Sequence, residues 1–219
     1  MISDDEMTVY DDRHSQYITE LFAAQDETLR RIWETLPEKG FPAKYIQPEE
    51  GRFLQVIVRA SGAGKALEIG TLGGYSGIWI ARGLAPRGKL TTLEIDRRYA
   101  QIAQAHFEMA GVADRVEIVV GSALETLKRL TDGPFDFVFI DAEKYDYYAY
   151  FDWALENTRV GGIIAAHNAF RAGTVVGAEQ ADFKTEAIRA FNRRVASEPR
   201  VISTIYPAGD GMVVAVKTA

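Results

Sequence analysis

From Lys65 onward the sequence alternates short apolar runs with helical stretches, and this alternation restricts the fold more than any other feature. Runs of four to seven apolar residues between turn residues are predicted as buried strands, at Ala66–Ile69, Lys89–Ile95, Val116–Val120, Phe135–Ile140 and Gly162–Ala166. Helices fit between them, at Tyr75–Leu84, Tyr99–Ala110, Ala123–Leu130 and Tyr147–Asn157. Such a pattern is typical of a doubly wound parallel sheet that helices cover on both faces.

The two ends of the chain complete this architecture. After an irregular stretch over residues 170–182, a helix is predicted at Lys184–Ala196. Two strands follow, at Arg200–Tyr206 and Met212–Lys217, and the short connection Pro207-Ala-Gly-Asp-Gly211 predicts a hairpin. The last strand is therefore expected to run antiparallel to its neighbour.

Two amino-terminal helices are expected before the sheet begins. Apolar residues recur at helical spacing from His14 to Leu36, and again from Glu49 to Ser61. We predict a single α/β domain over residues 1–219, with a Rossmann-like, seven-stranded, mostly parallel sheet. In this prediction residues 1–47 form a helical extension and residues 48–219 form the core.

Charge and cysteine content exclude several kinds of site. The chain has 219 residues and a net charge of -6, which favours neither nucleic acid nor an anionic membrane as a partner. No apolar run is long enough to span a bilayer, and the first residues lack the features of a signal peptide. Without cysteine there are no disulfides or thiolate ligands, so a cytoplasmic location is expected. With only three histidines, a metal site would have to rely on carboxylate and amide oxygens.

A glycine-rich turn follows the first predicted strand, where open α/β sheets bind their ligands. Its glycines do not have the Gly-x-Gly-x-x-Gly spacing of a dinucleotide site. Instead, Glu68 precedes Gly70 by two residues, and Glu94 at the end of the second strand is placed to bind a ribose. Such acidic groups suit a cationic nucleoside such as S-adenosylmethionine. The alternative is a turn that needs glycine for its geometry alone.

Several motifs in order carry a family resemblance, namely Leu67-Glu-Ile-Gly-Thr-Leu-Gly-Gly-Tyr-Ser76, Leu93-Glu-Ile-Asp96, Ala110-Gly-Val-Ala-Asp-Arg115, Gly121-Ser-Ala123, Phe137-Val-Phe-Ile-Asp-Ala-Glu-Lys144 and Pro207-Ala-Gly-Asp-Gly211. From about Pro48 to Lys217 the chain resembles the caffeoyl-CoA and catechol O-methyltransferase group. The resemblance implies a class I S-adenosylmethionine-dependent enzyme, usually a homodimer, that methylates a phenolic hydroxyl with the help of a divalent cation. It also implies that the amino-terminal helices contribute to the acceptor pocket and the dimer contact.

The resemblance also assigns cofactor contacts. Residues around the methionine part would be Glu68, Gly70 and Ser76, with Glu94 on the ribose and Ala123 near the adenine. Asp141 would lie beside both the methionine part and the metal.

The metal site is where this chain departs from the family. The resemblance assigns Asp141 and Asn168 as metal ligands, but His167 stands where the family has an aspartate. A histidine ligand would weaken magnesium binding relative to softer cations such as manganese or zinc. Alternatively, His167 replaces the metal and acts as the general base, or it only hydrogen-bonds a neighbour.

Lys144 is the predicted catalytic base, again from the resemblance. A phenol has a pKa of about 10, so its proton must be removed before the oxygen can attack. The alternative is an exposed lysine that begins a helix. Acceptor contacts are less specific: Tyr145 and Tyr148 would stack on the acceptor or pack in the core, and Arg171 would meet it from the following loop.

The sequence thus predicts methyl transfer from S-adenosylmethionine to a phenolic or catechol-like hydroxyl of a small aromatic acceptor. A divalent cation, magnesium, manganese or another, is expected to assist. A metal-independent methyltransferase that uses His167 as base is the main alternative. A nicotinamide-dependent oxidoreductase and a non-catalytic nucleoside-binding module are the rivals from other classes.

Overall fold

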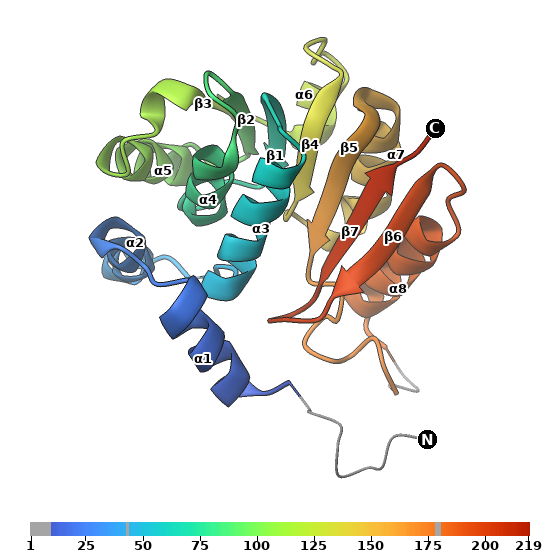
Figure 1. Ribbon diagram of the computed structural model, residues 1–219, viewed down its shortest axis with the longest axis horizontal. Helices are drawn as coiled ribbons and strands as arrows, with labels where there is room; N and C mark the ends of the chain where they lie inside the picture. Colours follow the sequence, from blue (N-terminus) through green and yellow to red (C-terminus); the bar gives the residue numbers. More distant parts are fainter. Residues whose placement is uncertain (1–9, 43, 178–180) are drawn as a thin grey trace.

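The computed structural model describes residues 10–42, 44–177 and 181–219, and Figure 1 shows a central sheet with helices on both of its faces. The seven strands lie in the order β3-β2-β1-β4-β5-β7-β6. All neighbours are parallel except β7, which runs antiparallel to both β5 and β6. The strands are β1 (Lys65–Ile69), β2 (Lys89–Glu94), β3 (Val116–Val120), β4 (Phe135–Ile140), β5 (Thr158–His167), β6 (Val201–Tyr206) and β7 (Met212–Lys217). This confirms the predicted fold class and the reversed last strand.

The helices alternate with the parallel strands, as the sequence pattern predicts. Those of the core are α3 (Pro48–Ala60), α4 (Tyr75–Gly83), α5 (Arg97–Met109), α6 (Ala123–Leu127), α7 (Tyr147–Asn157) and α8 (Phe183–Ala196). Single 3-10 turns occur at η2 (Ala113–Arg115) and η3 (Lys144–Asp146). Nearly all boundaries fall within a few residues of the predicted ones, because the capping and turn residues that end each element are local signals.

The core consists of two apolar clusters, one on each face of the sheet. Within β4, Phe137 and Phe139 belong to one cluster, whereas Val138 and Ile140 belong to the other. All four side chains are fully buried. A strand that is covered on both faces has no polar alternation, which explains why the central strands read as continuous apolar runs.

The single amino-terminal helix predicted from His14 to Leu36 is wrong. The structure has two helices there, α1 (Asp12–Phe22) and α2 (Glu27–Glu38). Asp26 caps the second, because its carboxylate accepts a hydrogen bond of 2.9 Å from the Leu29 backbone N–H. Apolar periodicity continues across the break, so only the capping aspartate marks it in the sequence.

Some expectations concern residues that the structure does not describe. Residues 1–9, on which the signal-peptide argument depends, and residues 178–180 of the predicted irregular stretch lie outside the described residues. Among the described helices, none has both the length and the apolar character that crossing a membrane would require.

The strand order also positions a ligand site. The chain moves from β1 outward to β3 and then returns to β4 on the other side of β1, so the order of the strands reverses between β1 and β4. In open α/β sheets, ligands bind beyond the carboxyl ends of the strands at such a point. The turn after β1 and the residues that follow β4 and β5 meet there.

Candidate active site

A pocket of about 470 Å³ lies at the carboxyl ends of β1, β4 and β5. Six of the predicted catalytic, cofactor and metal residues line it, namely Gly70, Ser76, Asp141, Lys144, His167 and Asn168. Three predicted cofactor residues, Glu68, Glu94 and Ala123, are not part of the lining. The structure therefore brings the predicted catalytic residues together with part of the predicted cofactor set.

The turn after β1 needs glycine for two reasons. Gly70 has a φ of 101°, and a Cβ atom at this position would clash with the backbone oxygen of Asp141. Gly74, at the start of α4, has a φ of 82°. The turn also holds Leu72 at a φ of 47°, a conformation that side-chain-bearing residues rarely adopt and that often marks a functional site.

Glu68 and Glu94 shape this turn from beneath the pocket. Glu68 is fully buried and accepts hydrogen bonds from the hydroxyls of Ser76 (2.6 Å) and Thr92 (2.7 Å). Burial raises the pKa of Glu68 to about 7, although these two hydrogen bonds oppose the shift. Glu94 accepts hydrogen bonds from the backbone N–H groups of Leu72 (2.7 Å) and Asp96 (2.9 Å). Both carboxylates thus fix the conformation of the residues that face the ligand.

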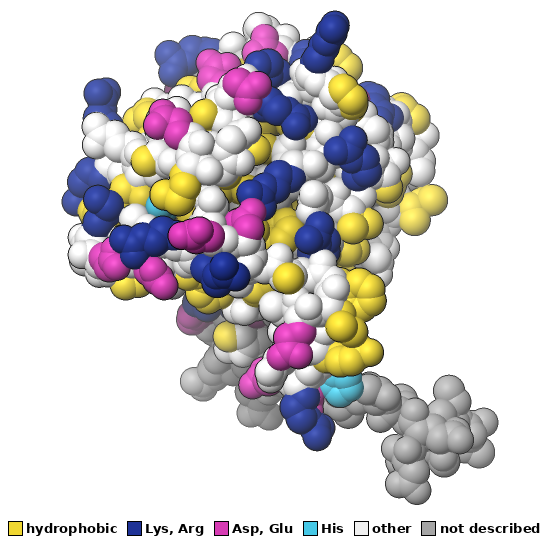
Figure 2. Space-filling view, turned by 60° about the vertical axis from the view of Figure 1, so that its left-hand side comes forward, with side chains coloured by type: hydrophobic (Ala, Val, Ile, Leu, Met, Phe, Trp, Pro, Cys, Tyr) yellow, Lys and Arg dark blue, Asp and Glu magenta, His cyan; other side chains and the backbone are white. Residues whose placement is uncertain are grey.

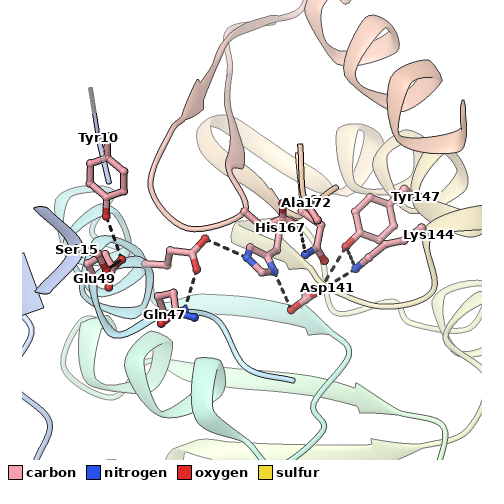
Figure 3. A network of polar contacts seen from close by, with 12 residues as sticks. Tyr10, Ser15, Gln47, Glu49, Asp141, Lys144, Tyr147, His167 and Ala172 are labelled. Atoms are coloured by element: carbon pink, nitrogen blue, oxygen red, sulfur yellow. Dashed lines mark hydrogen bonds and ion pairs between the residues drawn. The ribbon is translucent and has the colours of Figure 1, made fainter. Parts of the chain in front are cut away.

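Asp141 and Lys144 form the polar centre of the pocket (Figure 3). The Lys144 Nζ lies 3.0 Å from Oδ1 of Asp141 and donates a hydrogen bond of 2.7 Å to the hydroxyl of Tyr147. Burial would raise the pKa of Asp141, but the positive charges of Lys144 and His167 outweigh it and hold that pKa well below its usual value. Burial raises the pKa of the Tyr147 hydroxyl well above 10.0, so it stays protonated.

His167, the last residue of β5, lies between two carboxylates. Its Nε2 is 3.0 Å from Oε1 of Glu50 in α3, and its Nδ1 is 3.4 Å from Oδ2 of Asp141. Figure 3 shows the imidazole ring beside Asp141. Burial alone would lower the pKa of His167, but the two carboxylates reverse this effect and raise it to about 10. The two carboxylates therefore favour the positively charged form of the imidazole ring.

Glu50 is the site residue that sequence reasoning missed. It is 1% exposed, and it lies four and eight residues before Leu54 and Val58, which are completely buried on the same face of α3. A carboxylate on the buried face of a helix needs a partner, because burying an unpaired charge is costly. The position of Glu50 on the buried face could have been recognised from the sequence, but the identity of its partner could not.

Asn168 is positioned by the turn between β6 and β7. It has a φ of 60°, which asparagine tolerates better than most residues, and its amide nitrogen donates a 2.7 Å hydrogen bond to Asp210. The other carboxylate oxygen of Asp210 accepts a hydrogen bond from the Ala172 backbone N–H. The hairpin thus holds the loop that follows β5 against the pocket.

The aromatic residues of the pocket differ from those considered in the sequence. Tyr145 and Tyr148 are neither core nor pocket residues: they are 47% and 48% exposed and do not line the pocket. Tyr45 and Tyr75 line it instead, and their rings pack against each other at 5.6 Å between centroids. Arg171 also lines the pocket, as predicted.

The side chains predicted to bind a divalent cation do not fit one in this arrangement. Each ring nitrogen of His167 faces a carboxylate, and each oxygen of Asp141 faces a cationic group. Over residues 10–42, 44–177 and 181–219, the structure contains no group of three or more His, Cys, Asp or Glu side chains that could hold a metal ion. A metal ligand needs an unprotonated atom that points at the ion. The nitrogen and oxygen atoms of these side chains point at one another instead.

Comparisons with known proteins identify the family of the chain. The family model described as O-methyltransferase matches residues 19–218. The chain is 38% identical to a catechol O-methyltransferase of Niastella koreensis, over 91% of this chain and 94% of the relative. It is also 43% identical to a catechol O-methyltransferase of Mycobacterium tuberculosis, over 74% of each chain.

Solved structures show the same relationship. The O-methyltransferase from Bacillus cereus in complex with S-adenosylhomocysteine (SAH) superposes with a TM-score of 0.86, at 39% identity, covering 93% of this chain and 96% of the other. TomG from Streptomyces achromogenes, in complex with S-adenosylmethionine, has a TM-score of 0.84 at 35% identity, covering 97% and 100%. Together with the pocket at the reversal of strand order, these matches place this chain in the O-methyltransferase family of S-adenosylmethionine-dependent enzymes.

Proposed function

We propose that this enzyme methylates a phenolic or catechol-like hydroxyl of a small aromatic molecule. The observation that carries the proposal is a single pocket that joins the glycine-rich turn after β1 to the Asp141–Lys144 pair. S-adenosylmethionine would supply the methyl group, held at the turn by Gly70 and Ser76. The acceptor hydroxyl would face Lys144.

The chemistry assigned to Lys144 is proton removal from the acceptor. In the neutral form its Nζ accepts the phenolic proton, and the resulting ammonium is stabilised by Asp141 at 3.0 Å and by the Tyr147 hydroxyl at 2.7 Å. The acceptor oxygen becomes a phenolate, which forms the new carbon–oxygen bond as the methyl–sulfur bond breaks. His167 is not assigned this role, because both of its ring nitrogens face carboxylates.

The acceptor class is supported by the pocket walls and by the relatives. Tyr45, Tyr75, Ile46 and Leu72 give the pocket apolar surface beside its polar centre, as a flat aromatic molecule requires. Two relatives with at least 38% identity are named catechol O-methyltransferase.

A direct test is to incubate the purified protein with S-adenosylmethionine and a panel of phenols and catechols. Mass spectrometry should detect O-methylated product and SAH in equal amounts. If the protein binds SAH but methylates no hydroxyl of the panel, the proposed acceptor class is wrong. If NAD binds more tightly than SAH, the proposal of methyl transfer is itself wrong.

We also propose that the protein works as a homodimer through its amino-terminal extension. In Figure 1, α1 projects below the body of the domain, and none of its residues is buried. Its apolar side chains Tyr17, Leu21 and Phe22 are 63%, 59% and 64% exposed. Light scattering should give twice the mass of the chain, and charged substitutions at Leu21 and Phe22 should yield monomers.

A further inference from the structure

We propose that His167, clamped between Glu50 and Asp141, is a built-in cation that replaces a divalent metal, so that methyl transfer by this chain needs no metal ion. This inference rests on the proposed function and specifies how the site balances its charge. It is carried by the contacts of His167 and of the two carboxylates.

The ring of His167 has no free nitrogen. The contacts at 3.0 Å to Glu50 and 3.4 Å to Asp141 occupy Nε2 and Nδ1. An ionised carboxylate can only accept hydrogen bonds, so it pairs best with a nitrogen that carries hydrogen. Both contacts favour a nitrogen that carries hydrogen, so the arrangement favours the imidazolium form of the ring. The side chain is only 9% exposed, so water does not compete strongly for these contacts.

The two carboxylates are also fully engaged. The second oxygen of Glu50 accepts a 2.8 Å hydrogen bond from the Gln47 backbone N–H, and the second oxygen of Asp141 faces Lys144 at 3.0 Å. When Lys144 carries its proton, two carboxylates, one imidazolium and one ammonium sum to zero charge. A divalent cation entering this cluster would meet no net negative charge and would have to displace a buried ion pair.

Separate elements hold the cluster in place. Glu50 lies in the first turn of α3, His167 ends β5 and Asp141 follows β4. The turn between β6 and β7 covers Glu50, since a Cβ atom at Gly209 would clash with its carboxyl group. The imidazolium is therefore fixed beside the pocket, where it and Lys144 can stabilise a phenolate.

The substitution His167→Asp should convert this cluster into a metal site. It would remove the imidazolium and place three carboxylates, those of residues 50, 141 and 167, next to one another. Such a cluster repels itself unless a cation binds, so divalent ions should raise the melting temperature of this variant. The same substitution at His14, on α1 and away from the pocket, is the matched control.

The experiment compares wild type, H167D and H14D in EDTA and with Mg²⁺, Mn²⁺ or Zn²⁺, by thermal unfolding and calorimetric metal titration. We expect no metal-induced shift in wild type or H14D and a clear shift in H167D. Wild-type turnover should be equal in EDTA and in Mg²⁺. Metal binding to wild type at the pocket, or turnover that EDTA abolishes and a metal restores, would overturn the inference.

A second measurement on the wild type does not depend on the variant folding. Nitrogen-15 NMR of the histidine side chains at neutral pH should show both nitrogens of His167 protonated, and an unprotonated nitrogen there would contradict the proposal. Failure of the proposed function looks different: no phenol would be methylated either in EDTA or with metal, while the metal titration and the NMR spectrum would still decide the state of His167.

Discussion

At the scale of single residues, the polar centre of the pocket depends on Lys144. Its ammonium is stabilised by Asp141 and Tyr147, and its side chain is only 16% exposed. The motif after β4 predicted its position, because Lys144 comes three positions after Asp141, the residue that follows the strand. Its contact with Tyr147 depends on the 3-10 turn that starts α7.

Replacing Lys144 with alanine should lower kcat by about 10²–10⁴-fold, the usual contribution of a positioned general base. SAH affinity should change little, because the proposed cofactor contacts come from the turn after β1. Steady-state kinetics and calorimetric titration measure the two effects. Lys128→Ala, at an exposed position paired with Glu125, is the control and should retain full turnover. A Lys144→Ala variant with wild-type kcat would remove this residue from the mechanism.

Gly70 gives a second prediction at this scale. Gly70→Ala should destabilise the protein and weaken SAH binding, because it combines a left-handed conformation with a clash against Asp141. Gly40→Ala is the matched control: its φ is 76°, but a Cβ atom there would meet nothing within 4 Å. The free energy of unfolding of the control should fall by only about 1–2 kcal/mol. Urea unfolding measures both variants. Equal losses of unfolding free energy would mean that the close approach of residue 70 to Asp141 does not reduce stability.

At the scale of elements, one side chain of α3 hydrogen-bonds α1 and the residue Tyr10 before it. The buried carboxylate of Glu49 accepts hydrogen bonds from Tyr10 (3.0 Å), Ser15 (2.5 Å) and Thr19 (3.1 Å). The next residue, Glu50, holds His167, so two consecutive glutamates connect the first helix and the active site to α3 (Figure 3). Apolar burial contributes little to holding α1, since none of its residues is buried.

Glu49→Ala should therefore release α1 while leaving the sheet intact. Hydrogen bonds to a charged group contribute about 1.5–3 kcal/mol each, so amide exchange in α1 should accelerate tenfold or more. Hydrogen-exchange mass spectrometry would locate the effect. Glu20→Ala, on the exposed face of α1, should leave exchange elsewhere unchanged. Acceleration that extends equally to the central strands would show that Glu49 stabilises the whole domain instead.

At the scale of the whole molecule, the distribution of charge is even on the face seen in Figure 2. Lysine and arginine side chains are interspersed with acidic ones there, and apolar side chains gather on its lower projection, which α1 forms. The buried charges matter more for stability, because the solvent screens them least.

Glu68 should make stability depend on pH. Its pKa rises from 4.5 to about 7 on folding, so the folded state binds the proton more tightly. This stabilises the ligand-free protein below pH 4.5, and the contribution disappears as the pH rises through 7. The unfolding free energy of Glu68→Gln, taken relative to wild type, should therefore rise by up to about 3 kcal/mol from pH 5 to pH 8. Urea unfolding at the two pH values measures this; a constant difference would mean that Glu68 titrates normally.

The sequence was enough to predict the sheet, the order of its elements and the glycine-rich turn after β1, because strands, caps and glycine turns are encoded by neighbouring residues. It also identified Asp141, Lys144, His167 and Asn168, which follow strand ends that a parallel sheet brings to one edge. It did not separate α1 from α2, since one capping aspartate interrupts an otherwise continuous helical pattern.

The surroundings of His167 follow from the three-dimensional fold. Its partner Glu50 lies 117 residues earlier, on a helix whose position follows from packing and not from any local pattern. From the sequence His167 could be a metal ligand, a base or a hydrogen-bonding residue, because its chemistry depends on what faces its two nitrogens. Burial between two carboxylates favours a proton on each ring nitrogen, and that arrangement exists only once α3, β4 and β5 have come together.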